Sequence, residues 1–204
     1  MKFQELQHFS KNKLIFSLDE IRLFEPNFHR YQLNYWQNKG YIKKIINGWY
    51  IFSDEKLDEN KLCIVSNRVY IPSYVSLEYA FRYYNLIPEG VFQITSVGTK
   101  KTVNFVTPIG YFEYRKIATK YYFGYKLVQS GQDFFLIAYP EKAIIDYFYL
   151  NPQIKTKEQF YELRFSQTNL KQLISKSRLN KFLSIYEAEL QTRVLNFVNY
   201  ILNI

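Results

Sequence analysis

The chain has 204 residues and a formal net charge of +9, and a hydrophobic fraction of 48% with few glycines and prolines argues against a disordered protein. A single cysteine, Cys63, excludes a disulfide framework, and only two histidines, His8 and His29, disfavour a metal site. No apolar leader and no run of about 18 apolar residues occurs, so we expect a cytoplasmic protein without a membrane partner, and the positive charge favours a polyanionic partner such as nucleic acid.

The start of the chain predicts three helices. Apolar residues spaced by three over residues 3–9 indicate an opening helix. Residues 17–20, Ser-Leu-Asp-Glu, are a capping box that begins a second helix, which Pro26 ends. Asn27 is a good N-cap for a third helix that runs to about residue 39, where Gly40 supplies the stop. Local chemistry thus predicts two helices joined by a tight turn.

The third helix has two different faces. Leu33 and Trp36 are three apart and mark the inward face. The outward face is rich in amides and phenols and contains no acid, and its residues are Asn27, Arg30, Tyr31, Asn34, Tyr35 and Asn38. Such a face suits a helix that is presented to the major groove of DNA.

A hairpin follows the third helix. Two β-prone runs, at residues 41–46 and 49–52, flank Asn47-Gly48. Asn-Gly is a strong signal for a two-residue turn, because a type I′ turn needs positive φ at both central residues. Residues 17–52 therefore predict a winged helix-turn-helix, and the hairpin is its wing.

The rest of the chain predicts a larger mixed α+β domain. We interpret the acidic stretch at residues 53–60 as a linker and place the domains at residues 1–54 and 55–204. The predicted elements are a helix at 76–84, strands at 91–96, 102–107, 111–127 and 134–138, a helix from 140 to 150, and a helix opened by the capping box at 156–159. Apolar 3/4 spacing over residues 179–201 predicts a long terminal helix, packed on the sheet or, alternatively, on a partner.

The residue types on the predicted helix and hairpin are those that contact DNA. The side chains of Asn27, Asn34 and Asn38 can make bidentate hydrogen bonds to adenine edges, and Arg30 can reach guanine or phosphate. Lys43, Lys44 and Asn47 of the hairpin are expected to contact phosphates. A protein-binding winged helix is the alternative, because exposed Tyr31 and Tyr35 also suit a protein interface.

Most of the positive charge lies outside this region. Residues 1–55 carry 8 basic and 6 acidic side chains, a net charge of +2, whereas the remainder carries 19 against 12, a net charge of +7. We expect additional phosphate contacts from Lys100, Lys101, Arg115, Lys116 and Lys120, with a merely solvated basic face as the alternative.

Catalytic patterns are weak, and we expect no enzyme, no cofactor and no metal. The glycines have no phosphate-loop spacing, and no nucleophile elbow occurs. Glu141 and Asp146 are five apart and fall on different faces of the predicted helix, and the helix dipole accounts for Glu141 near the helix start. Glu113 is an acid beside the basic residues Arg115 and Lys116, which is the one hint of a nuclease in the sequence. A nuclease-like enzyme that the winged helix targets to nucleic acid is therefore the second hypothesis. A structural adaptor that uses the aromatic surface is the third.

Several segments between residues 14 and 150 together resemble the AbiEi family of antitoxins, winged-helix regulators of abortive-infection toxin-antitoxin systems of type IV. The order and spacing of the segments carry the resemblance. The segments are 16–21 (FSLDEI), 33–42 (LNYWQNKGYI), 47–50 (NGWY), 74–80 (YVSLEYA), 94–96 (ITS), 122–125 (YFGY) and 137–146 (IAYPEKAIID).

The resemblance implies a repressor that binds inverted repeats in the promoter of its own operon, as a monomer in solution or a weak dimer on DNA. It also implies that the larger domain counteracts a nucleotidyltransferase-type toxin without a stable complex. Two departures affect the expected DNA contacts. Asn47 stands where the family commonly has a basic residue at the wing, and several helix positions that are often Arg or Lys are Asn or Tyr here.

Overall fold

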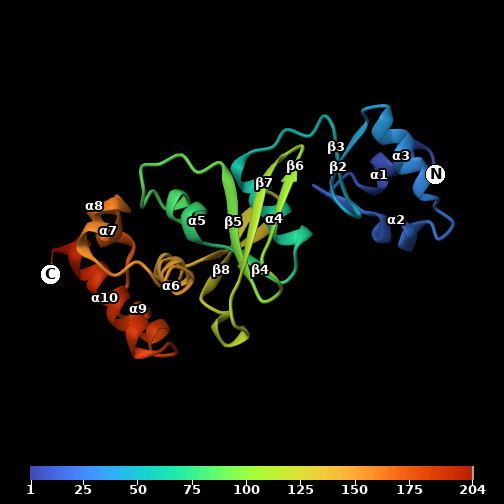
Figure 1. Cartoon of the computed structure of the whole chain (residues 1–204). Helices are drawn as coiled ribbons and strands as arrows, with labels where there is room; N and C mark the ends of the chain where they lie inside the picture. The colour runs from blue at the N-terminus through green and yellow to red at the C-terminus, as the bar shows by residue number, and fades with distance from the viewer. Residues whose placement is uncertain (204) are drawn as a thin grey trace.

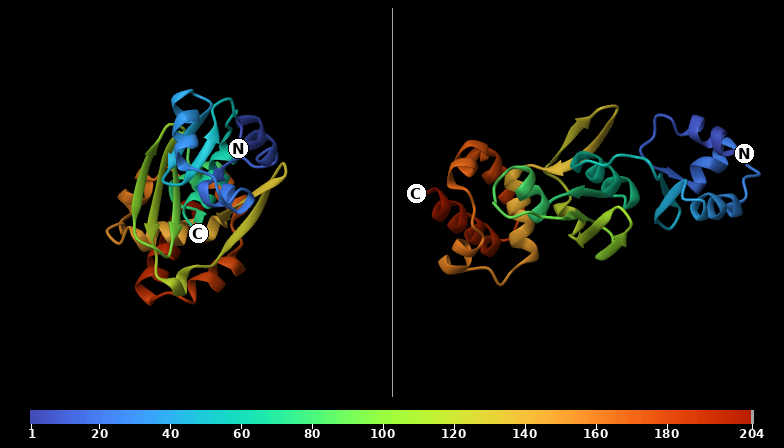
Figure 2. Two further views of the ribbon diagram at one scale, coloured as in Figure 1. Left: turned by 90° about the vertical axis from the view of Figure 1, so that its right-hand side faces the viewer. Right: turned by 90° about the horizontal axis from the view of Figure 1, so that it is seen from above.

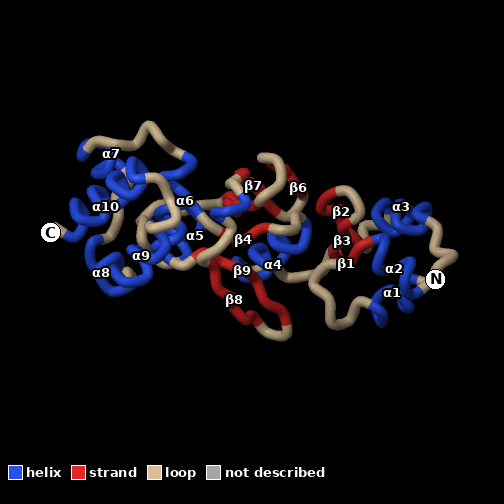
Figure 3. Tube along the Cα trace, turned by 90° about the horizontal axis from the view of Figure 1, so that it is seen from below, coloured by secondary structure: helices blue, strands red, loops and turns tan. Residues whose placement is uncertain are grey.

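The computed structural model describes residues 1–203, and three parts follow one another along its long axis (Figure 1). The N-terminal part combines three helices with a small sheet, a six-stranded sheet lies in the middle, and helices form the other end. Figure 2 shows the two termini at opposite ends of the molecule, and Figure 3 shows the strands concentrated between the helical ends. The fold is mixed α+β and ends in a long helix, as predicted.

The N-terminal part contains the predicted helices and hairpin. Its elements are α1 (Phe3–Phe9), β1 (Phe16–Ser17), α2 (Leu18–Phe24), α3 (Arg30–Asn38), β2 (Ile42–Ile46) and β3 (Trp49–Phe52). The capping box is confirmed, since the Glu20 N–H donates to Ser17 Oγ at 3.1 Å and the Ser17 N–H donates to Glu20 Oε2 at 2.9 Å. A tight turn joins β2 and β3 as predicted, but of its two central residues only Gly48 has a positive φ, +85°, and Asn47 does not, so the turn is not the type I′ turn that the sequence predicted.

The start of α3 differs from the prediction. The helix begins at Arg30 with His29 as its N-cap, so Asn27 lies in the preceding turn and caps nothing. Phe28 is buried, and its ring lies 5.9 Å from the ring of Trp36. This packing holds the turn in a non-helical path, whereas the predicted end at Gly40 is correct. Gly40 has φ +74°, and its N–H donates to the carbonyl of Gln37.

The central sheet has the strand order β6-β7-β5-β4-β9-β8. Its strands are β4 (Ser73–Val75), β5 (Gln93–Gly98), β6 (Val103–Thr107), β7 (Gly110–Lys116), β8 (Tyr125–Ser130) and β9 (Asp133–Ala138). The β4–β9 and β5–β7 pairs are parallel, and the other pairs are antiparallel. The predicted single strand at residues 111–127 is therefore wrong. It divides into β7, a 3₁₀ turn η1 (Thr119–Tyr121) and β8.

Helices cover both faces of this sheet. They are α4 (Glu59–Val69), α5 (Leu77–Tyr83) and α6 (Pro140–Leu150). Neighbouring residues of β5 point to opposite sides, because Ser96 Oγ lies 2.9 Å from Ser66 Oγ of α4, whereas Thr95 Oγ1 donates to the carbonyl of Ser76 at the start of α5. The predicted linker at 53–60 is too long, since Asp58 caps α4 by accepting the Lys61 N–H.

The C-terminal end consists of four helices packed on and beside α6. They are α7 (Lys157–Glu162), α8 (Gln167–Leu173), α9 (Lys176–Leu183) and α10 (Ala188–Leu202). The continuous helix predicted over 179–201 is broken between α9 and α10, where buried Tyr186 stacks on Tyr121 at 4.1 Å. α10 packs on α6, α7 and α8 rather than on the sheet. Within residues 1–203, no helix combines the length and the apolarity needed to span a bilayer.

The β2–β3 hairpin joins the N-terminal part to the middle part. One of its faces carries Ile42 and Tyr50, which pack in the core formed with α1, α2 and α3. The other face carries Ile45 and Ile51, which are 5% and 1% exposed and belong to the large core around the central sheet. β2 also contacts β6. The hairpin is thus covered on both faces. A small domain that folds independently would need only one of its faces covered.

Candidate nucleic-acid interface

The exposed face of α3 is the part of the candidate interface that agrees best with the sequence. Leu33 and Trp36 are 0% and 4% exposed and anchor the helix in the N-terminal core. The remaining predicted side chains on the helix are all exposed, and they are Arg30, Tyr31, Asn34, Tyr35 and Asn38. The helix contains no Asp or Glu, so nothing along it repels a phosphate.

Asn34 and Asn38 are the amides that α3 presents together. They are four residues apart and therefore lie one above the other on the same face of the helix. Asn27 is also exposed, but it belongs to the turn before α3 and not to this face. The Lys39 ammonium lies 5.8 Å above the ring of Tyr35, which adds a cation beside the two amides. Sequence reasoning did not include Lys39, although its position next to Asn38 was the available signal.

Only the edge and the tip of the hairpin are accessible to a DNA backbone, because both of its faces are covered. β2 is the edge strand of the small sheet, whose order is β1-β3-β2. Lys43 on this edge is exposed, with its ammonium 3.4 Å from the carbonyl of Ser53, and Lys44 is half-buried. Asn47 at the tip is exposed. Because Ile45 and Ile51 close the outer face against the central sheet, only these edge and tip residues can reach a DNA backbone.

Three of the predicted additional lysines form a separate basic patch, defined here as Lys100, Lys101 and Lys116. The register pairs Gly98 with Lys116, and the Lys116 N–H donates to Thr102 Oγ1 at 3.1 Å, so all three lysines lie where β5 and β7 end. All three are exposed. β6 begins beside the basic patch, and Figure 1 shows the opposite end of β6 pointing toward the β2–β3 hairpin. The basic patch and the hairpin therefore lie at opposite ends of β6.

The other two predicted phosphate contacts lie outside the basic patch, and they differ in their surroundings. The guanidinium of Arg115 is half-buried and donates to the carbonyl of Leu150 at 3.3 Å. Lys120 lies 3.8 Å from Glu187 and 4.8 Å above the ring of Tyr121. Arg115 is therefore held inside the protein, whereas the Lys120 side chain is 61% exposed and remains accessible to a phosphate.

The central motifs of the sequence meet in a buried polar network and not at a surface site. Lys142 forms an ion pair with Asp146, and both side chains are fully buried. The hydroxyls of Tyr74 and Ser76 each donate to Asp146 Oδ2 at 2.9 Å. Burial raises the pKa of the Asp146 carboxyl and lowers the pKa of the Lys142 ammonium. Gly124 lies directly over the stem of Lys142. The network therefore brings together three of the sequence motifs, at residues 74–80, 122–125 and 137–146.

Glu141 takes part in a second, separate pair. It is fully buried, and the guanidinium of Arg178 donates to both of its oxygens, from Nε at 2.9 Å and from Nη2 at 3.1 Å. The Ser175 N–H also donates to Glu141, at 2.7 Å. The sequence analysis explained Glu141 by the dipole of α6. In the structure Arg178 of α9 neutralises the Glu141 carboxylate directly, and the dipole contributes less.

The carboxylates named for a nuclease do not converge. Glu141 and Asp146 sit in separate buried pairs, and Glu113 accepts a hydrogen bond from Gln93 at 2.9 Å. Among residues 1–203, no group of three or more His, Cys, Asp and Glu side chains is arranged to hold a metal ion. Cys63 is buried as well, and burial raises the pKa of its thiol to about 12.

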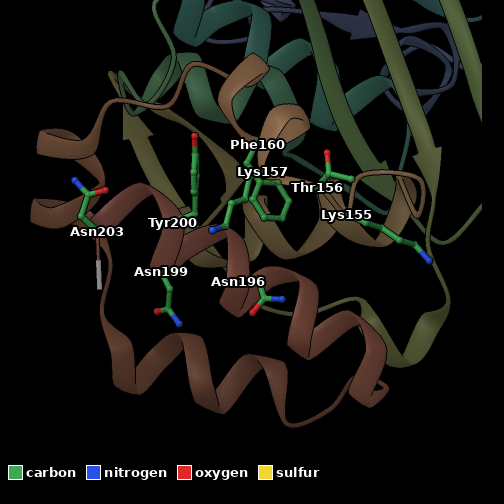
Figure 4. Close-up of a pocket in the computed structure, with 8 residues that line it drawn as sticks. All are labelled: Lys155, Thr156, Lys157, Phe160, Asn196, Asn199, Tyr200 and Asn203. Carbon is green, nitrogen blue, oxygen red and sulfur yellow. The ribbon is translucent and has the colours of Figure 1, made fainter.

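A surface hollow between α7 and α10 was not found from the sequence. It measures about 680 Å³, and Figure 4 shows Lys157 and Phe160 of α7 facing Tyr200 of α10. The full set of lining residues is Lys155, Thr156, Lys157, Phe160, Asn196, Asn199, Tyr200 and Asn203. The only sequence signal was the polar face of the last helix, which carries asparagines at positions 196, 199 and 203.

The comparisons with known proteins add no family assignment. No protein-family model matches the sequence, and no curated protein matches it either.

Proposed function

We propose that this protein is a DNA-binding transcriptional repressor in which the N-terminal part acts as a winged helix-turn-helix. In this proposal α3 enters the major groove, and the edge of β2 with Lys43 contacts the neighbouring backbone. The observation that carries it is the exposed, acid-free face of α3, where Asn34 and Asn38 lie beside Arg30 on a helix that Leu33 and Trp36 anchor.

Each residue type has a matching role in such a complex. Asn34 and Asn38 would each present an amide to the two adjacent hydrogen-bonding groups of an adenine. Arg30 would reach guanine or phosphate, and Lys39 and Lys43 would neutralise phosphates. Arg115 is not part of the proposal, because its half-buried guanidinium donates to the carbonyl of Leu150, and Lys120 stays an exposed cation outside the basic patch. The basic patch contacts the same DNA only if the duplex bends or extends toward the far end of β6.

The test is salt-dependent binding to the DNA upstream of the gene. Fluorescence anisotropy with that DNA and with an unrelated duplex of equal length is expected to show tighter binding to the upstream DNA, and both affinities should fall with rising salt. A structural adaptor predicts no salt-sensitive DNA binding. A nuclease predicts metal-dependent cleavage that is lost when Glu113 is replaced, and the same samples, analysed on a gel, test that alternative.

We further propose, from the resemblance to AbiEi antitoxins, that the protein counteracts a nucleotidyltransferase-type toxin without forming a stable complex with it. Co-expression tests this second activity. If a nucleotidyltransferase gene adjoins this one, its expression should arrest growth, and co-expression of the full chain should restore growth. Absence of rescue, with both proteins detected by immunoblot, would contradict the antitoxin role and leave the DNA-binding proposal unaffected.

A further inference from the structure

Two hollows flank the side chain of Tyr200 near the end of α10. The first is the hollow of about 680 Å³ between α7 and α10, and the second, of about 530 Å³, is lined by residues that include Tyr161, Phe165 and Ile201. Tyr200 lines both hollows. Each volume falls within the range of roughly 300–1,000 Å³ that is usual for small-molecule sites. We call the two together the Tyr200 groove.

The first hollow is polar and basic. Asn196 and Asn199 lie three residues apart on α10, and Asn203 follows the end of the helix in a left-handed conformation with φ +55°. All three line this hollow. Figure 4 shows the Lys157 ammonium on the Tyr200 side of the hollow, whereas the Lys155 side chain extends away from it. Lys155 is paired with Glu189 at 2.9 Å. No ion pair joins Lys157 to any other residue within 1–203, so its charge is available to an anion.

The second hollow is largely apolar and aromatic. Tyr161 of α7 is 74% exposed, so its ring is open to solvent at this hollow. Phe165 and Ile201 form the apolar lining. Glu162 and Arg164 are the charged residues of this hollow, and Arg164 is paired with Glu89 at 2.9 Å, so this hollow suits a base rather than a phosphate. The Tyr200 ring lies 5.9 Å from the ring of buried Phe160 and lines both hollows.

We propose that the Tyr200 groove binds a nucleotide, with its phosphate at Lys157, its polar edges at Asn196 and Asn199, and its base stacked against Tyr200 or Tyr161. A cation, a row of amides and an exposed aromatic ring are the three features by which proteins hold unpaired nucleotides. The same chemistry occurs in a free mononucleotide and in the end of a single-stranded nucleic acid. The proposal does not rest on DNA reading by α3, since the two surfaces lie at opposite ends of the molecule (Figure 1).

The experiment uses the full chain labelled with ¹⁵N and records amide NMR spectra during titration. The probes are UMP and AMP, short single strands of oligouridylate and oligoadenylate, and inorganic phosphate as an anion without a base. We expect saturable shifts confined to α7 and the second half of α10, including the side-chain amides of Asn196 and Asn199. Inorganic phosphate should bind roughly tenfold more weakly than the probes that carry a base, because it cannot stack.

The variants are surface changes chosen to leave the fold intact. Lys157→Ala should raise the Kd of the best probe about tenfold, and Asn199→Ala should raise it several-fold. Lys176→Ala on α9 is the matched control and should leave the Kd unchanged, because Lys176 is exposed and lies outside the groove.

The titrations also distinguish the two possible ligands, a free mononucleotide and the end of a single strand. Tighter binding of the oligonucleotides than of UMP and AMP assigns the groove to single strands, and equal binding assigns it to mononucleotides. Absence of saturable binding by every probe, binding that survives both groove substitutions, or shifts confined to α3 would overturn the proposal. Duplex DNA affinity measured on the same variants reports on α3 separately, so each proposal can fail without the other.

Discussion

Lys142 and Asp146 form an ion pair one helical turn apart in α6, and neither side chain is accessible to solvent. The pair is held by residues distant in sequence, since the hydroxyls of Tyr74 and Ser76 donate to the second carboxylate oxygen. Aromatic rings surround the Lys142 ammonium, and those of Phe123 and Tyr186 lie 5.2 Å and 5.9 Å away. This network joins the start of α5, the turn before β8 and α6.

Removing both charges of the pair should cost less stability than the two single losses added together. Lys142→Met leaves a buried carboxylate without its cation and is expected to lower the free energy of unfolding by roughly 3–5 kcal/mol. Asp146→Asn leaves a buried ammonium unpaired, with a loss of similar size. The double variant retains an acceptor for Tyr74 and Ser76 and should lose less than the sum of the single losses. Urea unfolding of the four proteins measures the coupling, and additive losses would contradict the paired role.

The same pair predicts a pH dependence with a definite sign. Burial raises the pKa of Asp146, and Lys142 is the main group that lowers it, so Lys142→Met raises it further. The folded variant then takes up a proton at a higher pH than the unfolded chain does, and its free energy of unfolding increases as the pH falls. The stability gap between Lys142→Met and the wild type should therefore narrow as the pH falls from neutrality toward the ordinary pKa of an unfolded Asp, about 4. Urea unfolding across this pH range checks this, and a constant or widening gap would show that Asp146 is not the group involved.

The sequence predicted correctly those helix ends and turns that depend only on neighbouring residues. The capping box at Ser17, the turn at Gly48 and the stop at Gly40 each depend on neighbours within a few residues, and all three are present. The errors arise where distant contacts decide. Phe28 joins the core through Trp36 and delays the start of α3, and Tyr186 is buried against Tyr121, which interrupts the apolar 3/4 spacing of the last helices.

The candidate site was predictable to a smaller extent. The exposed face of α3 follows from helical periodicity once Leu33 and Trp36 are taken as buried. Charge counts could not show that Arg115 is bonded to Leu150, because that contact spans 35 residues. The hollow beside Tyr200 requires α7 and α10 to be adjacent, and no pattern in the sequence brings those two helices together.

Gly124 should tolerate substitution less well than any turn glycine in open space. Its φ is +75°, and a Cβ there would lie 2.9 Å from the Lys142 Cγ, inside a fully buried network. Gly131 has a similar φ of +63° with nothing near its Cβ position, which makes it the matched control. Gly131→Ala should cost only the backbone strain of about 1–2 kcal/mol. Gly124→Ala should cost more in thermal or urea unfolding, and equal losses would mean that Lys142 moves aside freely.

The covered hairpin predicts that the N-terminal part unfolds together with the rest. Both tryptophans, Trp36 and Trp49, lie in this part, so tryptophan fluorescence reports on it, whereas far-ultraviolet circular dichroism reports on the whole chain. The two urea transitions of the wild type should coincide, because Ile45 and Ile51 belong to the large core.

Ile45→Asp places a charge in that junction and should shift the fluorescence transition to lower urea than the circular dichroism transition. Ile185→Asp is the control, since Ile185 is 47% exposed and lies between α9 and α10, away from the junction, and the transitions of this variant should still coincide. Separate transitions in the wild type would instead indicate two independent domains.

Base reading and backbone contact by the N-terminal part can be separated by two double variants. Asn34→Ala with Asn38→Ala should weaken binding to the upstream DNA more than binding to unrelated DNA, because a bidentate contact to a base edge contributes roughly 1–3 kcal/mol of discrimination. Lys43→Ala with Lys44→Ala should weaken both about equally and reduce the salt dependence, because phosphate contacts carry no sequence information. Lys43 should account for most of that loss, since Lys44 is half-buried and Lys43 is exposed.

Fluorescence anisotropy at several salt concentrations measures both effects on both DNAs. Asn180→Ala is the control for the asparagine pair, because Asn180 is an exposed amide on α9, at the other end of the molecule from α3, and its loss should leave both affinities unchanged. Equal losses on the two DNAs for the asparagine pair would rule out base reading by these amides and would leave α3 as a helix that only positions the protein on the backbone. A loss restricted to the upstream DNA would instead identify Asn34 and Asn38 as the source of sequence preference, because the anchoring residues Leu33 and Trp36 are unchanged in that variant.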